Sequence, residues 1–394
     1  MNNPLPILFF TFLLLLNTTN SRAEEDGELL PGASRTEEYL PIIKHLKVAI
    51  VANHTSQINK THLVDSLLKR GVNIIKIFSP EHGFRGTGDA GKKINNSKDK
   101  LTGIPIVSLY GDRRKPSAKD MQNIDVLLFD IQDVGVRFYT YISTMHYVMD
   151  ACAKNNIPLI ILDRPNPNGH YIDGPVLEDE YTSFVGMHPV PLVHGMTIAE
   201  YAKMINGEGW LSEGIKCKIS YVPCLNYDHS TKVRLNTPPS PNLRSMKAIY
   251  AYPTLGLFEG TIISVGRGTE KPFTMFGHPD WPCDTFTFTP KSIIGMSTNP
   301  KHIDKKCFGK DISQTNIDSL YKQGVHIEWL LNAYAKLGQD PNFFNNFFNL
   351  LAGNNKLQEQ IKQQKSAEEI RESWQKGLVH FNKIRKQYLL YEDF

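Results

Sequence analysis

The first half of the chain alternates short apolar runs with segments of helical periodicity. The runs predict buried strands at 47–52, 73–78, 104–109, 124–129 and 157–162. Leu63, Val64, Leu67 and Leu68 would share one face of a helix between the first two runs, and a second helix is predicted around 142–152. Short and nearly continuous apolar strands separated by helices are typical of a parallel sheet covered on both faces. The pattern therefore predicts an α/β fold.

The pattern changes after the proline-rich turn at 237–242. The run at 284–289 alternates threonine and phenylalanine, which favours antiparallel or barrel-like β structure. Helical stripes follow at 326–337 and 366–390. Since 394 residues exceed the usual size of a single core, we predict two domains with a boundary near residue 240.

The N-terminus has the pattern of an export signal. Residues 7–16 are apolar, and Ser21-Arg22-Ala23 places small residues where a signal peptidase needs them. We expect cleavage after Ala23, which makes residues 1–23 a signal peptide and the mature protein periplasmic or extracellular. No later run approaches the length that a bilayer span requires, so we expect no membrane span in the mature chain.

The charge argues against a nucleic-acid-binding protein, and the cysteine positions argue against one of the possible disulfides. The 44 basic and 40 acidic residues give a formal charge of +4, which is too even for a nucleic-acid-binding protein. Cys217 and Cys224 flank a predicted strand at 216–222, which would hold them too far apart for a disulfide. The sequence leaves a disulfide between Cys283 and Cys307 open.

Polar side chains follow every strand of the predicted sheet. In sheets of this kind, ligands bind outside the carboxyl ends of the strands, where these side chains would converge. Single Asp or Asn residues at strand ends often cap the next helix, but Glu, His and Arg are poor caps. We therefore expect a polar cleft lined by the segments 53–55, 79–82, 110–113, 130–137 and 163–166.

Two features could indicate a nucleotide cofactor or a metal site, but neither has the required pattern. Residues 86–91 match GxGxxG, but they neither leave a strand directly nor open a helix, so we expect no nicotinamide, flavin or other cofactor. His54, His82, His194 and His278 are scattered without a paired metal-ligand spacing. A metal-dependent hydrolase is therefore a less favoured alternative, and we expect no metal.

Several motifs together resemble one family. The segments 79–86 (SPEHGFRG), 130–144, 163–169, 194–197, 238–242 and 256–273 are similar, in order, to the NamZ-type exo-β-N-acetylmuramidases. The resemblance implies a Rossmann-like catalytic domain at 24–240 and a C-terminal β-barrel-type domain with terminal helices at 241–394. It also implies release of N-acetylmuramic acid from the non-reducing ends of peptidoglycan-derived glycans. The resemblance further implies that Glu81 is the catalytic Glu of the family.

Glycoside hydrolysis generally needs a second carboxyl group beside the acid. Asp130 and Asp133 lie on the same predicted sheet as Glu81, while Glu259 would come from the second domain. We favour an Asp of the 130–133 pair, followed closely by Glu259.

N-acetylmuramic acid carries a lactyl carboxylate, so a selective site should present a cation, preferably Arg. Arg85 and Arg267 are preferred over Arg137 and Arg164, which have neighbouring Asp residues. Further substrate-binding candidates from the same motifs are Asn53, His82, Tyr139, Asp163, Asn166 and His194. A catalytically silent periplasmic protein that binds muropeptides or sugars is the main alternative function.

Overall fold

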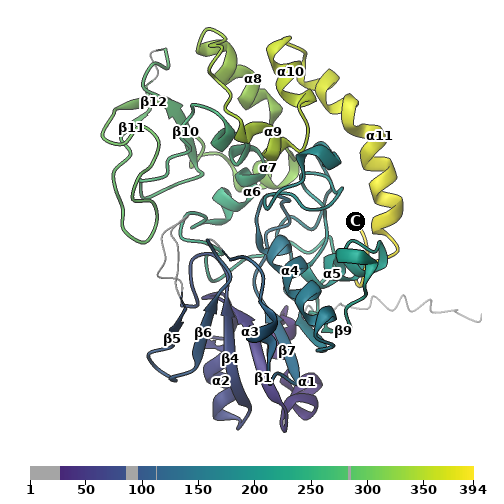
Figure 1. Cartoon of the computed structure of the whole chain (residues 1–394). Helices are drawn as coiled ribbons and strands as arrows, with labels where there is room; N and C mark the ends of the chain where they lie inside the picture. Colours follow the sequence, from purple (N-terminus) through teal and green to yellow (C-terminus); the bar gives the residue numbers. More distant parts are fainter. Residues whose placement is uncertain (1–26, 86–95, 112, 283–284) are drawn as a thin grey trace, which may run out of the picture.

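The computed structural model describes residues 27–85, 96–111, 113–282 and 285–394 (Figure 1). The predicted signal peptide, the GxGxxG segment and Cys283 lie outside the described residues. Cys152, Cys217, Cys224 and Cys307 are free thiols in the structure.

The first half is built on a seven-stranded sheet. Its order is β5 (Ser97–Lys98), β6 (Pro105–Ser108), β4 (Asn73–Ser79), β1 (Lys47–Ala52), β7 (Val126–Asp130), β8 (Leu159–Leu162) and β9 (Ile219–Val222). All neighbouring strands run parallel except β5, which is antiparallel to β6. The predicted parallel sheet is confirmed.

The chain fills this sheet outward from its centre. After β1, the strands β4 and β6 are added on one side, and the chain then crosses back to add β7, β8 and β9 on the other. This is the order of a doubly wound Rossmann sheet, with its topological switch point between β1 and β7.

Alternate residues of the central strand pack against different layers. Val48 and Ile50 belong to a core cluster with α1 (Thr36–Ile43) and α2 (Leu63–Lys69). Ala49 and Val51 belong to the other cluster, with α4 (Tyr141–Lys154) and α5 (Ile198–Gly207). This follows from the two-residue period of a strand. Shorter elements of this half are β2 (Gln57–Ile58), β3 (Thr61–His62) and α3 (Ala118–Met121).

The second half contains a small antiparallel sheet and several helices. The strand order is β10 (Met275–His278), β12 (Cys307–Asp311) and β11 (Thr287–Phe288), so β12 is central. Antiparallel structure is therefore confirmed, but within the described residues β10 and β11 each pair with β12 and the sheet stays open instead of closing into a barrel. The helices are α6 (Met246–Leu255), α7 (Ile317–Lys322), α8 (Ile327–Lys336), α9 (Phe347–Ala352), α10 (Lys356–Lys362) and α11 (Ala367–Arg385).

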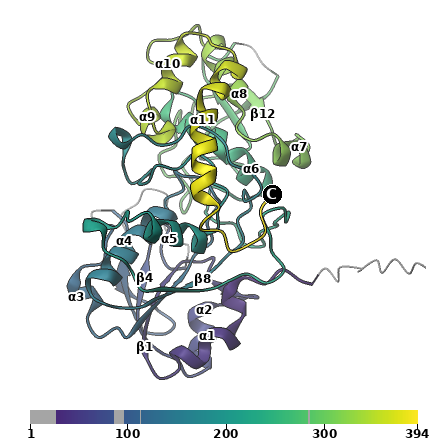
Figure 2. The same cartoon turned by 90° about the vertical axis from the view of Figure 1, so that its right-hand side faces the viewer.

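The last helix returns the chain to the first half. Helix α11 begins with the capping box of Ser366 and Glu369 and runs down the face of the molecule that Figure 2 shows, from the second half toward the first. At its end, the buried guanidinium of Arg385 donates to the carbonyl oxygen of Gly195 at 2.7 and 3.0 Å. The Tyr391 hydroxyl then donates to Asp163 at 2.6 Å and accepts from the Cys224 N–H at 2.8 Å. In the part of the chain that is described, no helix has the length and apolar character needed to cross a membrane.

Candidate active site

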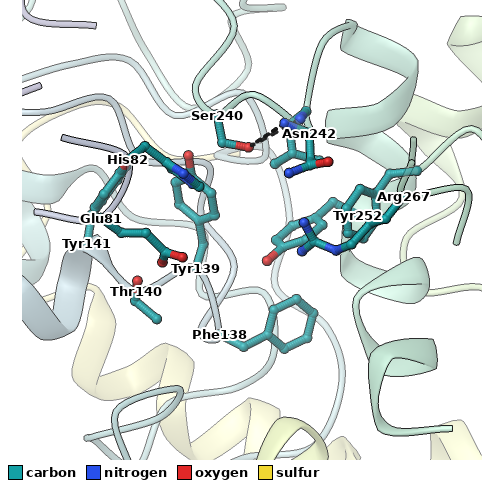
Figure 3. A pocket seen from close by; sticks show the side chains of 12 residues that line it. Glu81, His82, Phe138, Tyr139, Thr140, Tyr141, Ser240, Asn242, Tyr252 and Arg267 are labelled. Atoms are coloured by element: carbon teal, nitrogen blue, oxygen red, sulfur yellow. Dashed lines mark hydrogen bonds between the residues drawn. The ribbon is translucent and has the colours of Figure 1, made fainter. Parts of the chain in front are cut away.

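Two adjoining pockets form a cleft lined by residues of both halves of the chain. Figure 3 shows the smaller of the two. The small pocket has a volume of about 70 Å³ and the large pocket about 440 Å³. Glu81, Phe138, Thr140, Tyr252 and Arg267 line both. We call the two pockets together the catalytic cleft.

Glu81 reaches this cleft because of how strand β4 ends. Pro80 follows the last strand residue, and the chain turns sharply at His82 and Gly83, whose φ angles of 69° and 78° lie in the left-handed region. Figure 3 shows the Glu81 carboxylate and the Tyr252 hydroxyl pointing toward one another across the pocket. His82 is buried and lines the small pocket.

Tyr110 is a hydrogen-bond partner of Glu81. Burial, together with the adjacent Glu81 carboxylate, raises the pKa of Tyr110, so its hydroxyl keeps its proton at neutral pH. Tyr110 follows β6 and lines the large pocket. The end of the neighbouring strand thus supplies a neutral donor to the carboxyl group of Glu81.

Glu259 and Arg267 form an ion pair on the wall that comes from the second half. Glu259 lies in the short 3₁₀ helix Leu257–Gly260, and Arg267 holds it with two bonds, at 2.6 and 3.1 Å. Both side chains are 25% exposed, and both line the large pocket. Burial lowers and the Glu259 carboxylate raises the pKa of Arg267, with a net increase. The pair is therefore charged and fixed in orientation.

Three tyrosines contribute to the apolar lining of the small pocket. The ring of Tyr139 packs edge-on against Tyr141 at 4.9 Å and against Tyr252 at 5.9 Å. The Tyr139 hydroxyl donates to the carbonyl oxygen of Pro239 at 2.7 Å. Burial raises the pKa of all three hydroxyl groups. Tyr139 was predicted, whereas Tyr252 was not among the candidates.

Asn53 supports this wall from behind. Its side-chain N–H donates to the Tyr141 hydroxyl at 2.9 Å, and its side-chain oxygen accepts from Thr55. Asn53 is fully buried and lines neither pocket of the cleft. It therefore positions a residue of the site and does not face the ligand.

The structure places Asp130 away from the cleft. Its carboxylate binds the guanidinium of Arg164 with two bonds, at 2.5 and 2.9 Å, and both side chains are buried. Neither residue lines the catalytic cleft. This pair ties the end of β7 to the end of β8, so the sequence preference for Asp130 as the second carboxylate finds no support in its position.

Asp133 and His194 are buried together behind the tyrosines. Their nearest atoms lie 3.9 Å apart, and Asp133 accepts from the Gly135 N–H at 2.7 Å. Burial raises the pKa of Asp133 to about 7 and lowers the pKa of His194 to about 3. Neither lines the catalytic cleft, and at neutral pH the His194 ring is uncharged.

Arg137 is a structural residue. Its fully buried guanidinium donates to four carbonyl oxygens, those of Pro175, Val190, Leu351 and Ala352. These carbonyls belong to both halves of the chain, so Arg137 joins the halves and does not reach a ligand.

Asp163 and Asn166 also bind protein groups. Asp163 accepts from Tyr391 and from the Ala199 N–H near the start of α5, and burial raises its pKa to about 7. The Asn166 side chain donates to the Met196 carbonyl and accepts from the Asn168 N–H. Both are buried away from the cleft, where they fix the loop after β8.

Arg85 lies outside the cleft as well. Its guanidinium forms two bonds to Asp65 at 3.1 Å and two to Asp99 at 2.8 and 2.9 Å. With two carboxylates on it, Arg85 is already neutralised, and we no longer favour it as the reader of a lactyl carboxylate.

Arg114 is a cation of the cleft that the sequence did not single out. Its guanidinium lies over the ring of Phe184 at 4.2 Å, and both residues line the large pocket. Within the described part of the chain, no carboxylate forms an ion pair with Arg114. The signal was its place just after the strand end at 110–113, where the sequence already predicted ligand contact.

Metal ligands do not gather in the described ranges. No group of three or more His, Cys, Asp or Glu side chains there could hold a metal ion. The arrangement offers instead two carboxylates, two arginines and several phenols, which suits acid–base chemistry on a polar substrate.

Comparisons with known proteins cover nearly the whole chain. Residues 48–247 match the family model of the N-terminal part of exo-β-N-acetylmuramidase NamZ, and residues 250–391 match that of its C-terminal part. A peptidoglycan β-N-acetylmuramidase NamZ from Bacillus subtilis (strain 168) is 37% identical, over 90% of this chain and 89% of its own.

Two crystal structures from Bacteroides fragilis NCTC 9343, both described as DUF1343 family proteins, share the fold. One is 46% identical with a TM-score of 0.87 and covers 93% of this chain and 100% of its own. The other is 28% identical with a TM-score of 0.79, and the match covers 92% of this chain and 99% of the other. The chain therefore belongs to the NamZ family of exo-β-N-acetylmuramidases.

Proposed function

We propose that the protein is an exo-acting glycosidase that releases N-acetylmuramic acid from the non-reducing ends of peptidoglycan fragments during cell-wall turnover. The observation that carries this proposal is the large pocket, which contains the carboxyl groups of Glu81 and Glu259 together with the guanidinium groups of Arg267 and Arg114. Family membership and the muramidase activity of the Bacillus subtilis relative support it.

Glu81 acts as the general acid. It sits on the rigid end of a buried strand, and its carboxyl group faces the pocket, where it can reach the oxygen of a glycosidic bond. It donates its proton to that oxygen as the bond to the anomeric carbon breaks, so the leaving sugar departs as a neutral alcohol. The hydrogen bond with Tyr110 holds the carboxyl group in one orientation.

Glu259 is the second carboxylate. It shares the large pocket with Glu81, whereas the Asp130 carboxylate is bound to Arg164 and Asp133 is enclosed behind the tyrosines. Arg267 binds both carboxylate oxygens of Glu259 and fixes their direction. An ionised carboxylate stabilises the positive charge that develops at the anomeric carbon, and it can attack that carbon or activate a water molecule.

Arg114 reads the lactyl carboxylate that distinguishes N-acetylmuramic acid from N-acetylglucosamine. It is held against Phe184 yet offers its donors to the large pocket, and a guanidinium binds a carboxylate with two parallel hydrogen bonds. Arg267 lies in the same pocket and adds to its positive potential, but Glu259 already engages it. This moves the predicted role from Arg85 to Arg114.

Incubation of the purified protein with the disaccharide of N-acetylmuramic acid β-linked to N-acetylglucosamine tests the proposal. We expect equimolar release of the two sugars, unchanged by EDTA. Binding of the disaccharide without release would identify a sugar-binding protein, and loss of release in EDTA would identify a metal-dependent hydrolase.

We also propose that the protein is exported and cleaved after Ala23, as its N-terminal pattern predicts. Its polymeric substrate is assembled outside the cytoplasm, which agrees with export. N-terminal sequencing of the protein recovered from periplasm or medium should begin at Glu24.

A further inference from the structure

The loop between β11 and β12 packs behind the wall of the cleft that carries Glu259. We call residues 291–305 of this loop the clamp loop. Several of its hydrogen bonds go to residues 258–268, the segment that holds the Glu259–Arg267 ion pair. No residue of the clamp loop lines the small or the large pocket. The clamp loop therefore contacts the backbone of this wall and does not face the ligand.

Lys301 places its ammonium group in a cluster of backbone carbonyls. Although Lys301 is an exposed residue, its Nζ lies within 3.5 Å of four carbonyl oxygens. They belong to Phe258 at 3.2 Å, Glu259 at 2.9 Å, Thr261 at 2.5 Å and Ile263 at 3.5 Å. Carbonyls at the end of a helix have no partner within it, and a lysine side chain can bind them. The turn after the 3₁₀ helix Leu257–Gly260 thus forms a cation site that Lys301 occupies.

Two further bonds of the clamp loop hold the same segment. The His302 ring donates through Nε2 to the carbonyl oxygen of Ile262 at 2.6 Å. The Lys291 N–H donates to the carbonyl oxygen of Gly268 at 2.8 Å, one residue after Arg267. Gly268 has a φ of 78°, and a Cβ there would lie 2.4 Å from the Lys291 carbonyl oxygen, so this contact requires glycine. The clamp loop is therefore bonded to the chain beside each member of the ion pair.

The position of the ion pair depends on what holds this segment. The bonds within the pair fix its two side chains relative to each other, but both residues belong to the same segment. Their position relative to Glu81 is set by the contacts between the segment and the rest of the protein. The Ile262 N–H donates to the Phe343 carbonyl at 2.9 Å, so the segment keeps another anchor if Lys301 is replaced. At Glu259 itself, the backbone carbonyl is bound by the Lys301 ammonium.

We propose that Lys301 is a positioning residue for the reaction in the catalytic cleft. Its ammonium fixes the backbone at Glu259, so that the carboxylate faces the anomeric carbon of the bound sugar. This inference rests on the role proposed above for Glu259 as the second carboxylate. A displacement of such a group by about 1 Å can cost about 10²-fold in rate. Lys301 lines neither pocket, so it acts through Glu259 and not on the substrate.

Lys301→Met removes the ammonium and keeps an unbranched stem. We expect kcat on the muramic disaccharide to fall about tenfold or more, because the Glu259 carboxylate is no longer held in place. KM should stay close to the wild-type value, because Arg114 lies on a different segment and still binds the lactyl carboxylate. Lys305→Met is the matched control, since Lys305 is an exposed lysine of the clamp loop whose side chain forms no ion pair or hydrogen bond within the described ranges. Its kcat should equal that of the wild type.

Lys301→Cys allows the ammonium to be restored in the folded protein. Treatment with 2-bromoethylamine alkylates an exposed thiol and produces a side chain of lysine length that ends in an ammonium group. We expect this treatment to recover most of the kcat that the variant has lost. The wild type treated in the same way is the control, and its kcat should not change, since the described cysteines are buried.

A double variant tests whether Lys301 acts through Glu259. Lys301→Met should add little to the loss of kcat caused by Glu259→Gln, because the carboxylate to be positioned is already gone. Amide hydrogen exchange of residues 257–264 provides a measurement that needs no substrate. Exchange should be faster in Lys301→Met than in the wild type, and it should be unchanged in Lys305→Met.

The same measurements can overturn the proposal. It fails if Lys301→Met keeps the wild-type kcat, if alkylation of Lys301→Cys restores no activity, or if the losses of the two single variants multiply in the double variant. If the wild type itself releases no sugar, the function proposed for the cleft fails instead. Hydrogen exchange then still decides whether Lys301 holds the segment, and unchanged exchange in Lys301→Met would refute that as well.

Discussion

Arg267 donates a hydrogen bond to each carboxylate oxygen of Glu259, at 2.6 and 3.1 Å, in the pocket that Glu81 also lines. The first half of the chain thus supplies one carboxyl group that is hydrogen-bonded to a neutral phenol. The second half supplies another that is locked to a guanidinium. Two carboxyl groups in such different surroundings suit different roles, one as the proton donor and one as the second carboxylate.

Glu81→Gln should lower kcat on the muramic disaccharide by about 10²–10⁴-fold, because an amide cannot donate the proton to the leaving oxygen. Its affinity for the disaccharide, measured by titration, should stay within a few-fold of the wild type. Glu270→Gln is the matched control, since Glu270 is 85% exposed on the surface and should not affect kcat. Activity of Glu81→Gln above a tenth of the wild type would remove Glu81 from the role of acid.

Glu259→Gln should lower kcat about 10²-fold or more, because the developing positive charge loses its anion. The free energy of unfolding should change by no more than about 1 kcal/mol, as the ion pair is partly exposed. Denaturant unfolding and steady-state kinetics on the same preparation provide both numbers. Unchanged kcat would contradict the assignment of Glu259.

Asp130→Asn should lower the stability of the protein and leave kcat nearly unchanged, the opposite of the result expected for Glu259→Gln. Arg164 would keep its charge in a buried site without its carboxylate, which costs about 3–5 kcal/mol of stability. At a temperature where the variant is folded, its kcat should be close to that of the wild type. A large loss of kcat with normal stability would restore Asp130 as the second carboxylate.

Arg114→Gln should raise KM for muramic substrates at least tenfold, because the lactyl carboxylate loses its partner. The inhibition constant of N-acetylglucosamine, which lacks that group, should change less than twofold. Arg113→Gln is the neighbouring control, since Arg113 pairs with Asp120 and does not line the cleft. Equal losses for both sugars would show that Arg114 does not read the carboxylate.

Asp133→Asn should change how stability depends on pH. Burial raises the pKa of Asp133 to about 7, so between about pH 4 and 7 the folded protein holds a proton that the unfolded chain has released. Asp133 therefore lowers the free energy of unfolding as the pH rises through this window. Asn cannot titrate, and it can still accept from the Gly135 N–H.

The stability of the variant relative to the wild type should accordingly increase by up to about 4 kcal/mol from pH 4 to pH 7. Urea unfolding at half-unit pH steps measures this. Some pH dependence should persist in the variant, because burial also raises the pKa of Asp163 to about 7. Parallel pH profiles for the two proteins would show that Asp133 is ionised in the folded state.

The sequence predicted the sheet well because strands that are buried on both faces leave nearly continuous apolar runs. It also identified Glu81, since a glutamate directly after such a strand has no ordinary capping role. It could not separate Asp130 from Glu259. Both are acids within family motifs. Only the fold shows that the Asp130 carboxylate is paired with Arg164, which lies 34 residues further along the chain.

The sequence was equally unable to show which arginines are free to bind a ligand. Arg85 was favoured because, unlike Arg137 and Arg164, it has no neighbouring Asp in the sequence. In the structure, Asp65 and Asp99 come from two other segments and neutralise it. Arg114 drew no attention because its pattern is that of an ordinary loop. The charge that a ligand meets depends on which partners fold onto each side chain, and sequence distance does not give that.

The return of the C-terminal tail has a consequence for how the molecule is made. The hydroxyl that holds Asp163 at the end of β8 comes from Tyr391, and the Glu200 carboxylate accepts from the N–H of Leu390. On a ribosome, the first half therefore emerges long before the residues that complete it. We expect a nascent chain stalled before residue 386 to remain sensitive to protease in its N-terminal half, and the finished protein to unfold as one cooperative unit.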